Sequence, residues 1–197
     1  MRCHCFLSLS VLFLVGNCVP VVSQTVAIYV SDYHSSPIQG TILSTKGNGS
    51  TSPPTDIAGK TKIVMPSEVQ PGDELSLTLV HAPVKTMQIM SPWQGRATVP
   101  KSTGFIEVVL GVPGDKVALQ DPRVVSTWAQ AIVRKNDQSG FVVDAPTRNL
   151  KDFAKQVGFT PNEIDSAIRS LGTSDDETKR SKAAMYVNQY PSAPKLF

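Results

Sequence analysis

The sequence predicts an α+β fold in which a two-layer antiparallel β-sandwich is followed by a small α-helical region. From Thr25 to Leu110, short apolar segments with a period of two residues alternate with turns rich in glycine and proline. After Gly111 the apolar residues recur at spacings of three and four, which is the pattern of amphipathic helices. We therefore expect about seven strands over residues 24–112 and helices over residues 113–197.

The strands are predicted from the alternation and from the turns that end them. In the strand predicted over residues 74–80, Leu75, Leu77 and Leu79 share one face, and a Pro-Gly-Asp turn directly precedes the strand. The Asn48-Gly49 pair favours a tight hairpin, because both residues tolerate positive φ. Residues 92–100 are interpreted as a polar loop. The predicted strands span residues 26–30, 41–45, 62–65, 74–80, 87–90 and 105–110.

The first helix is predicted to begin directly after Asp121. An aspartate at the N-cap, followed by Pro122 at the first helical position, is a strong start signal. Val125, Trp128 and Ile132 then fall on one helical face. We expect Trp128 to pack against the neighbouring helices or against the sandwich.

Three further helices are predicted after this one. Asn149 is interpreted as the N-cap of the second helix, and residues 138–146 as the linker that precedes it. Thr160 and Glu163 form the capping-box pattern of the third helix. The fourth is predicted to begin at Ser174, with acidic residues in its first turn.

The composition excludes some classes of protein. Among 197 residues, 41% are hydrophobic and 18% are charged, which argues against a disordered chain. The formal net charge is only +3, and no run of lysine and arginine is longer than two residues. A protein that binds nucleic acid electrostatically needs a stronger basic patch, so we expect no nucleic-acid partner.

The first 23 residues resemble a secretory signal peptide. Arg2 is followed by an apolar segment over residues 6–15, and small or apolar residues precede a cleavage site between Ser23 and Gln24. An uncleaved anchor is the alternative, but the apolar run is shorter than a membrane span requires. We therefore expect an extracytoplasmic protein, periplasmic or secreted, that begins at Gln24 and has no stable membrane span.

All the cysteines lie within this segment, at Cys3, Cys5 and Cys18. The chain after cleavage would therefore have no disulfide, no thiolate metal site and no cysteine nucleophile. A lipid on Cys18 is a further alternative, although Asn17 stands where a lipobox has a small residue.

Three turn motifs resemble those of a known family. They are Pro37-Ile38-Gln39-Gly40, then Pro54-Thr55-Asp56-Ile57-Ala58-Gly59-Lys60, then Pro71-Gly72-Asp73-Glu74-Leu75. In their order and spacing they resemble the carboxypeptidase-regulatory-like, or peptidase-associated, module. That resemblance implies an immunoglobulin-like or transthyretin-like sandwich of seven strands and a non-catalytic accessory role beside an enzyme or a repeat array.

The helical region carries a second resemblance. Residues 111–123 and 159–171 are similar to the region that joins such modules to tetratricopeptide repeats in bacterial secreted proteins. Tyr190, Ala193 and Phe197 match the spacing in the first helix of a repeat, whereas Pro191 and Pro194 depart from it, because internal prolines break helices. The resemblance implies a truncated start of a repeat.

The sequence lacks the common motifs of catalytic sites. His34 and His81 are the only histidines after the signal segment, and neither lies in a zinc-hydrolase motif. There is no Gly-x-Ser-x-Gly motif, phosphate-binding loop or dinucleotide fingerprint. Asp115 and Asp121 are interpreted as turn and cap residues. We expect no enzyme, no metal and no cofactor.

The segment around Trp93 is the candidate binding loop. Trp93, Gln94 and Arg96 bring an indole, an amide and a guanidinium together in a predicted loop, a combination suited to stacking on sugars or anchoring a protein. The alternative is that Trp93 closes the end of the sandwich. The function that we expect is a non-enzymatic adaptor or scaffold for a protein partner, and the alternative is a carbohydrate or cell-wall binding module that uses this loop.

Overall fold

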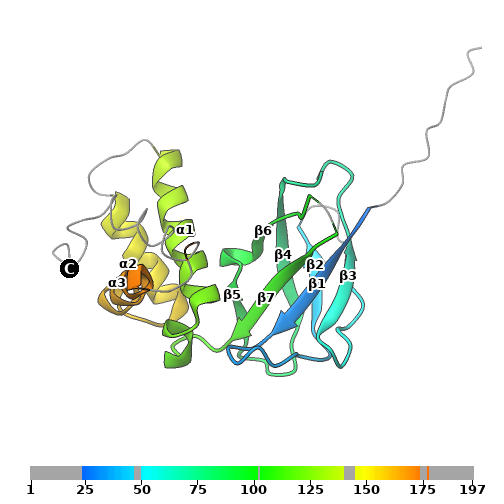
Figure 1. Ribbon diagram of the computed structural model, residues 1–197, viewed down its shortest axis with the longest axis horizontal. Helices are drawn as coiled ribbons and strands as arrows, with labels where there is room; N and C mark the ends of the chain where they lie inside the picture. The colour runs from blue at the N-terminus through cyan, green and yellow to red at the C-terminus, as the bar shows by residue number, and fades with distance from the viewer. Residues whose placement is uncertain (1–23, 47–49, 102, 140–144, 174–176, 178–197) are drawn as a thin grey trace, which may run out of the picture.

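The computed structural model describes residues 24–46, 50–101, 103–139, 145–173 and 177. It confirms a mixed α+β fold, with sheets of four and three strands and three α-helices in these residues (Figure 1). Four predicted features lie outside the described residues: the signal segment with its cysteines, the Asn48-Gly49 hairpin, the start of the fourth helix at Ser174, and the segment that resembles a tetratricopeptide repeat.

Six of the seven strands in the two sheets are those that alternation predicts, and β6 is the exception. The four-stranded sheet has the order β3-β1-β7-β5, and the three-stranded sheet has the order β2-β4-β6. The strands are β1 (Thr25–Ser31), β2 (Ile42–Thr45), β3 (Lys60–Val64), β4 (Glu74–His81), β5 (Gln88–Ser91), β6 (Arg96–Thr98) and β7 (Phe105–Gly111).

Two details differ from the sequence prediction. The sandwich was expected to be antiparallel, but β1 and β7 pair in parallel. These strands begin and end the β region, so no short hairpin fixes their relative direction. Residues 92–100 are not entirely a loop, because they contain a short 3₁₀ helix, η1 (Trp93–Gly95), and strand β6.

The two sheets share one hydrophobic core. Alternate residues of each strand point inward, and they are almost completely buried. Members from both sheets touch in a single cluster that includes Val26, Ile28, Val30, Leu43, Ile63, Leu75, Leu77, Ile106, Val108 and Leu110. The opposite face of each strand is left for solvent or for the helices.

The helices begin close to where their caps were predicted, with one exception. α1 (Pro122–Ser139) follows Asp121, whose carboxylate accepts a hydrogen bond from the Arg123 amide at 2.8 Å. α3 (Pro161–Ser170) has the predicted capping box of Thr160 and Glu163. α2 (Ala145–Val157) starts before Asn149, so the prediction of an N-cap there was wrong, and the two ends of the predicted linker, residues 138–139 and 145–146, are helical. The first turn of α2 lies before the apolar residues from which the start of this helix was predicted.

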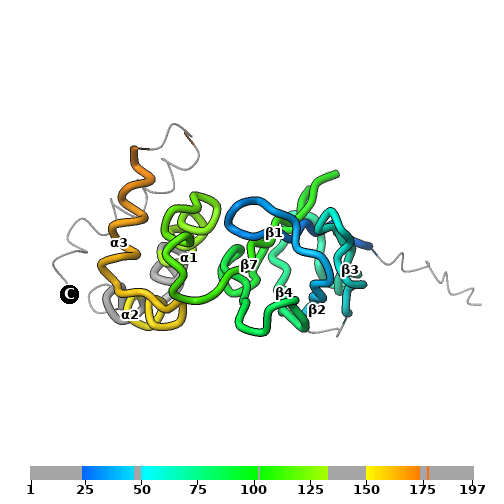
Figure 2. Tube along the Cα trace, turned by 90° about the horizontal axis from the view of Figure 1, so that it is seen from below, coloured from blue at the N-terminus to red at the C-terminus, as the bar shows by residue number. Residues whose placement is uncertain are grey.

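The helices pack on the outer face of the four-stranded sheet, at the end of β5 and β7. Met90 of β5 and Val109 of β7 belong to the hydrophobic cluster of the helices. α1 lies between the strands and the other two helices in both views (Figures 1 and 2). Because Val108 and Leu110 face the core between the sheets, β7 is covered on both sides here.

Trp128 and Gly111 show how close this contact is. The Trp128 side chain is completely buried, and its Nε1 donates a hydrogen bond to the Met90 carbonyl at 3.2 Å. A Cβ atom at Gly111 would lie 1.9 Å from the hydroxyl of Tyr33, so only glycine fits beside this ring. The prediction that Trp128 packs on its surroundings is confirmed. In the described residues, none of the helices is long and apolar enough to span a membrane.

Candidate functional site

Arg123 is the polar centre of the contact between the helices and the strands. It extends from the start of α1 and forms ion pairs with Asp121 at 2.7 Å and with Glu107 of β7 at 2.8 Å. The same guanidinium donates hydrogen bonds to the Ser31 hydroxyl and to the Asp32 carbonyl. The hydrogen bond with Asp121 raises the pKa of Arg123 above its ordinary value. Arg123 therefore fixes α1 to β1 and β7, and this is a structural role.

Tyr33 lies in the same contact. Its ring packs against the helical cluster, and its hydroxyl is buried with no hydrogen-bond partner among the described residues. Burial raises the pKa of this hydroxyl, and the carboxylates of Asp115 and Asp121 raise it further. The phenol therefore stays protonated at neutral pH.

The structure separates the three side chains of the predicted binding loop. Trp93 is half-buried and packs edge to face on Phe153 of α2, with ring centroids 4.3 Å apart. Gln94 is exposed, in the left-handed region at φ 52°. Arg96 is exposed on β6, with its guanidinium 3.9 Å from Glu74 of β4. Trp93 thus contacts the helices, while Arg96 pairs with a residue of the three-stranded sheet.

The other candidates for chemistry also lie apart. His34 and His81 are both exposed. Asp115 caps the short helix η2 (Lys116–Leu119) by accepting a hydrogen bond from the Val117 amide. In the part of the chain that the structure describes, no group of three or more histidine, cysteine, aspartate or glutamate side chains could hold a metal ion.

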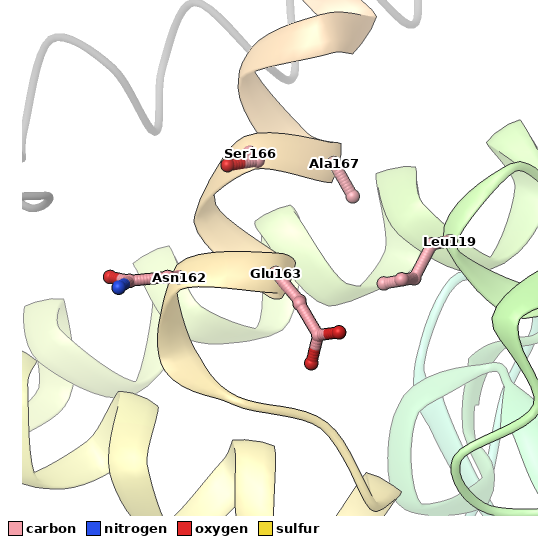
Figure 3. A pocket seen from close by; sticks show the side chains of 5 residues that line it. All are labelled: Leu119, Asn162, Glu163, Ser166 and Ala167. Carbon is pink, nitrogen blue, oxygen red and sulfur yellow. The ribbon is translucent and has the colours of Figure 1, made fainter.

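An open pocket lies between η2 and α3, with a volume of about 430 Å³. Leu119, Ala167 and Glu163 point toward one another, whereas Asn162 and Ser166 point away from them (Figure 3). Glu163 accepts hydrogen bonds from Lys116 and from Thr160, and these lower its pKa to about 2, with the larger effect from Lys116. Glu163 is therefore ionised near neutral pH and engaged in the capping box, which leaves it no role as a general acid there.

A different surface carries exposed apolar and cationic side chains and a half-buried tyrosine. It is the part of the outer face of the four-stranded sheet that the helices leave uncovered. We call it the outer-face patch and define it by Tyr29, Lys60, Lys62, Val64 and Phe105. Phe105 is 59% exposed and Val64 41% exposed. Large apolar side chains that are exposed beside one another mark interaction sites more often than isolated ones do.

The strand register places these residues on one face, with Val64 opposite Thr25 at the far end of β3 from Lys60. Ala27 of β1 lies between Lys62 of β3 and Phe105 of β7, and Tyr29 lies opposite Lys60. The rings of Tyr29 and Phe105 meet edge to face, with centroids 6.1 Å apart. The Tyr29 hydroxyl donates a hydrogen bond to the Ser35 carbonyl at 3.1 Å, which holds the ring in place.

The patch carries positive charge. Glu107 also lies on this face, but its carboxylate is paired with Arg123. Lys60 and Lys62 are exposed and supply the remaining charge of the patch. Sequence reasoning missed this surface, although one signal was present: Phe105 alternates with the core residues Ile106 and Val108 and so falls on the outer face of its strand.

Comparison of the chain with protein-family models, with curated proteins and with solved structures gives no match. The function is therefore argued from the surfaces described above.

Proposed function

We propose that this protein is a non-enzymatic, exported interaction module that binds a protein partner through the outer-face patch. In this proposal the seven strands form a transthyretin-like sandwich over residues 24–112, and the helices that follow make up the rest of an adaptor or scaffold. The single observation that carries it is that Phe105 and Val64 are exposed on the part of the outer face that the helices leave uncovered, with the half-buried Tyr29 packed against Phe105.

Support for the sandwich comes from the common core and from the turns. Both sheets contribute side chains to the same cluster. The glycines of the three turn motifs, Gly40, Gly59 and Gly72, have φ values of 79°, 70° and 101°, where a side chain would be strained. The resemblance to the carboxypeptidase-regulatory-like module rests on these same turns, and we keep it as part of the proposal.

The patch has the physical properties of a protein-binding surface. Aromatic side chains bury a large area on association and dominate the energetics of many interfaces. Tyr29 is held by its hydrogen bond to Ser35 and by the ring of Phe105, so little conformational entropy is lost when a partner binds. The Arg123 contacts next to the patch fix the strands that carry it.

The carbohydrate alternative receives less support. A tryptophan that stacks on sugars needs an accessible ring face, and Trp93 is already packed against Phe153. The guanidinium of Arg96 lies 3.9 Å from Glu74, so it is already paired within its own sheet. The other role expected for Trp93, closing the end of the sandwich, is not what it does either, because its ring packs against the hydrophobic cluster of the helices.

Capture from the extracytoplasmic fraction of the native source tests the proposal. We expect the wild-type protein to retain at least one specific protein that the double variant Phe105→Ser with Val64→Ser loses. The matched control is Ile57→Ser with Val84→Ser, which removes apolar side chains that are 80% and 46% exposed elsewhere. Substitutions at such exposed positions change stability by only about 0.5 kcal/mol.

The control variant should retain the same protein as the wild type. Equal capture by all three proteins would contradict the proposal, because it would place the contact away from the patch.

A further inference from the structure

Strand β3, beside the patch, is an edge of its sheet. The order β3-β1-β7-β5 leaves β3 with a strand partner on one side only, among the described residues. It pairs antiparallel with β1 from Lys60 opposite Tyr29 to Val64 opposite Thr25. An edge strand presents a row of peptide groups to which another extended chain can bind.

Two hydrogen bonds at the residues just before and just after β3 show which of its peptide groups face the free edge. The Val30 amide donates to the Gly59 carbonyl, and the Met65 amide donates to the Gln24 carbonyl, each at 2.8 Å. Because antiparallel pairs alternate, the peptide groups of Lys62 and Val64 point away from β1.

The first residue of the strand is different, because its peptide groups are already used. The Lys60 amide donates to the Asp56 carboxylate at 2.8 Å, and the Lys60 carbonyl accepts from the Asp56 amide at 3.0 Å. The edge available to another chain is therefore short and consists of Lys62 and Val64. So short an edge gives few main-chain hydrogen bonds, and a ligand needs side-chain contacts as well.

The side chains around this edge select the chemistry of the ligand. Lys60, Lys62 and Val64 are exposed on the outer face of β3, so Val64 supplies apolar surface on the edge strand itself. The neighbouring carboxylates are engaged: Glu107 pairs with Arg123, and Asp56 accepts hydrogen bonds from the Ala58 and Lys60 amides. Asp56 keeps its negative charge in these bonds, but the two exposed lysines outnumber it, so the side chains of Asp56, Lys60 and Lys62 together carry a net positive charge.

We propose that the partner supplies an extended acidic segment, which adds to β3 as a further strand. Its peptide groups pair with those of Lys62 and Val64. On the outer side, its carboxylates lie near the two lysines and an apolar side chain lies near Val64, while Phe105, on β7, contacts another part of the partner. This is strand addition with charge selection. The inference rests on the proposed function, because it names the chemistry of the partner at the same patch.

Titration of the full chain with short synthetic peptides tests the inference. In the first, acidic peptide, threonine occupies every second position, and glutamate or valine occupies the positions between. The second peptide has lysine in place of each glutamate. The third is the acidic peptide with N-methyl groups on the amides that would pair with β3. We expect the acidic peptide to shift the NMR signals of the Lys62 and Val64 amides. The lysine and N-methylated peptides should not shift them.

Charge-reversed variants complete the test. Lys60→Glu with Lys62→Glu should weaken binding of the acidic peptide by about tenfold, because two attractive pairs become repulsive. The matched control, Lys85→Glu with Lys101→Glu, changes the same number of exposed lysines away from the edge and should bind like the wild type.

Three results would overturn the inference: no shift with the acidic peptide, equal binding by both double variants, or equal binding of the N-methylated peptide. If the acidic peptide causes no shift, or if both double variants bind it equally, the role of Lys62 is only to protect the edge strand from unwanted pairing. If capture of the native partner still depends on Phe105 and Val64, the proposed function stands while this inference fails. If that dependence is missing too, both fail.

Discussion

Trp128→Ala is expected to lower the free energy of unfolding by about 3–5 kcal/mol, the range for removing a completely buried aromatic side chain. Trp128 is fully buried, and its ring meets those of Phe153 and Phe159 at centroid distances of 5.5 and 5.9 Å. It also donates its Nε1 hydrogen bond to the Met90 carbonyl, so it joins the helices to β5. Urea denaturation followed by circular dichroism measures the loss.

Trp128→Phe is the control for this prediction. It keeps an aromatic ring in the cluster but removes the donor to Met90, so we expect a clearly smaller loss than for alanine, with about 1 kcal/mol from the hydrogen bond. A change below about 1 kcal/mol for Trp128→Ala would show that the helices do not depend on this contact, and it would contradict the described packing.

Arg123→Leu is expected to destabilise the protein by about 3–5 kcal/mol, because it leaves a buried carboxylate without its cation. The Asp121 side chain is only 3% exposed, and it is paired with Arg123 at 2.7 Å. The substitution also removes the hydrogen bonds to Ser31 and Asp32 across the contact. Arg123→Lys should recover only part of the loss, since an ammonium group cannot replace the planar fork of donors.

Arg96→Leu provides the matched comparison. Arg96 also forms an ion pair, but its side chain is 56% exposed and lies 3.9 Å from Glu74. Exposed pairs of this kind contribute about 0–1 kcal/mol. Thermal and urea unfolding of the two variants should therefore differ strongly. Equal effects would mean that Arg123 does not hold α1 to the strands.

Local signals in the sequence were enough to predict much of this fold. The capping box of Thr160 and Glu163 and the Asp121-Pro122 start are short-range patterns whose hydrogen bonds form within a few residues. Alternation likewise located six of the strands. β6 was missed because it has only three residues and follows Pro92 and Gly95, which read as turn residues.

Contacts between distant segments were not predictable in this way. The parallel pairing of β1 with β7 joins strands from opposite ends of the β region. Trp93 meets Phe153 only because the helices fold back onto β5, and nothing near Trp93 in the sequence marks that contact. The run Val108-Val109-Leu110 did carry a signal, since consecutive apolar residues break alternation where a strand is covered on both faces.

The outer-face patch was predictable only in part from the sequence. Its members could be assigned to the outer side of their strands from the sequence, because Val64 and Phe105 alternate with core residues. What the sequence could not show is that β1 lies between β3 and β7 in the same sheet and that Arg123 pairs with Glu107 beside them. Those facts depend on strand order and register.

Site-specific photo-cross-linking in the native host tests the central claim most directly. A benzoylphenylalanine is placed at the site of Phe105 in one protein and at the site of Ile57, which is 80% exposed, in another. We predict a discrete protein adduct from the site of Phe105 and none of the same size from the site of Ile57. Identical adducts from both sites, or no protein adduct from the site of Phe105, would contradict the assignment of the patch as the partner-binding surface.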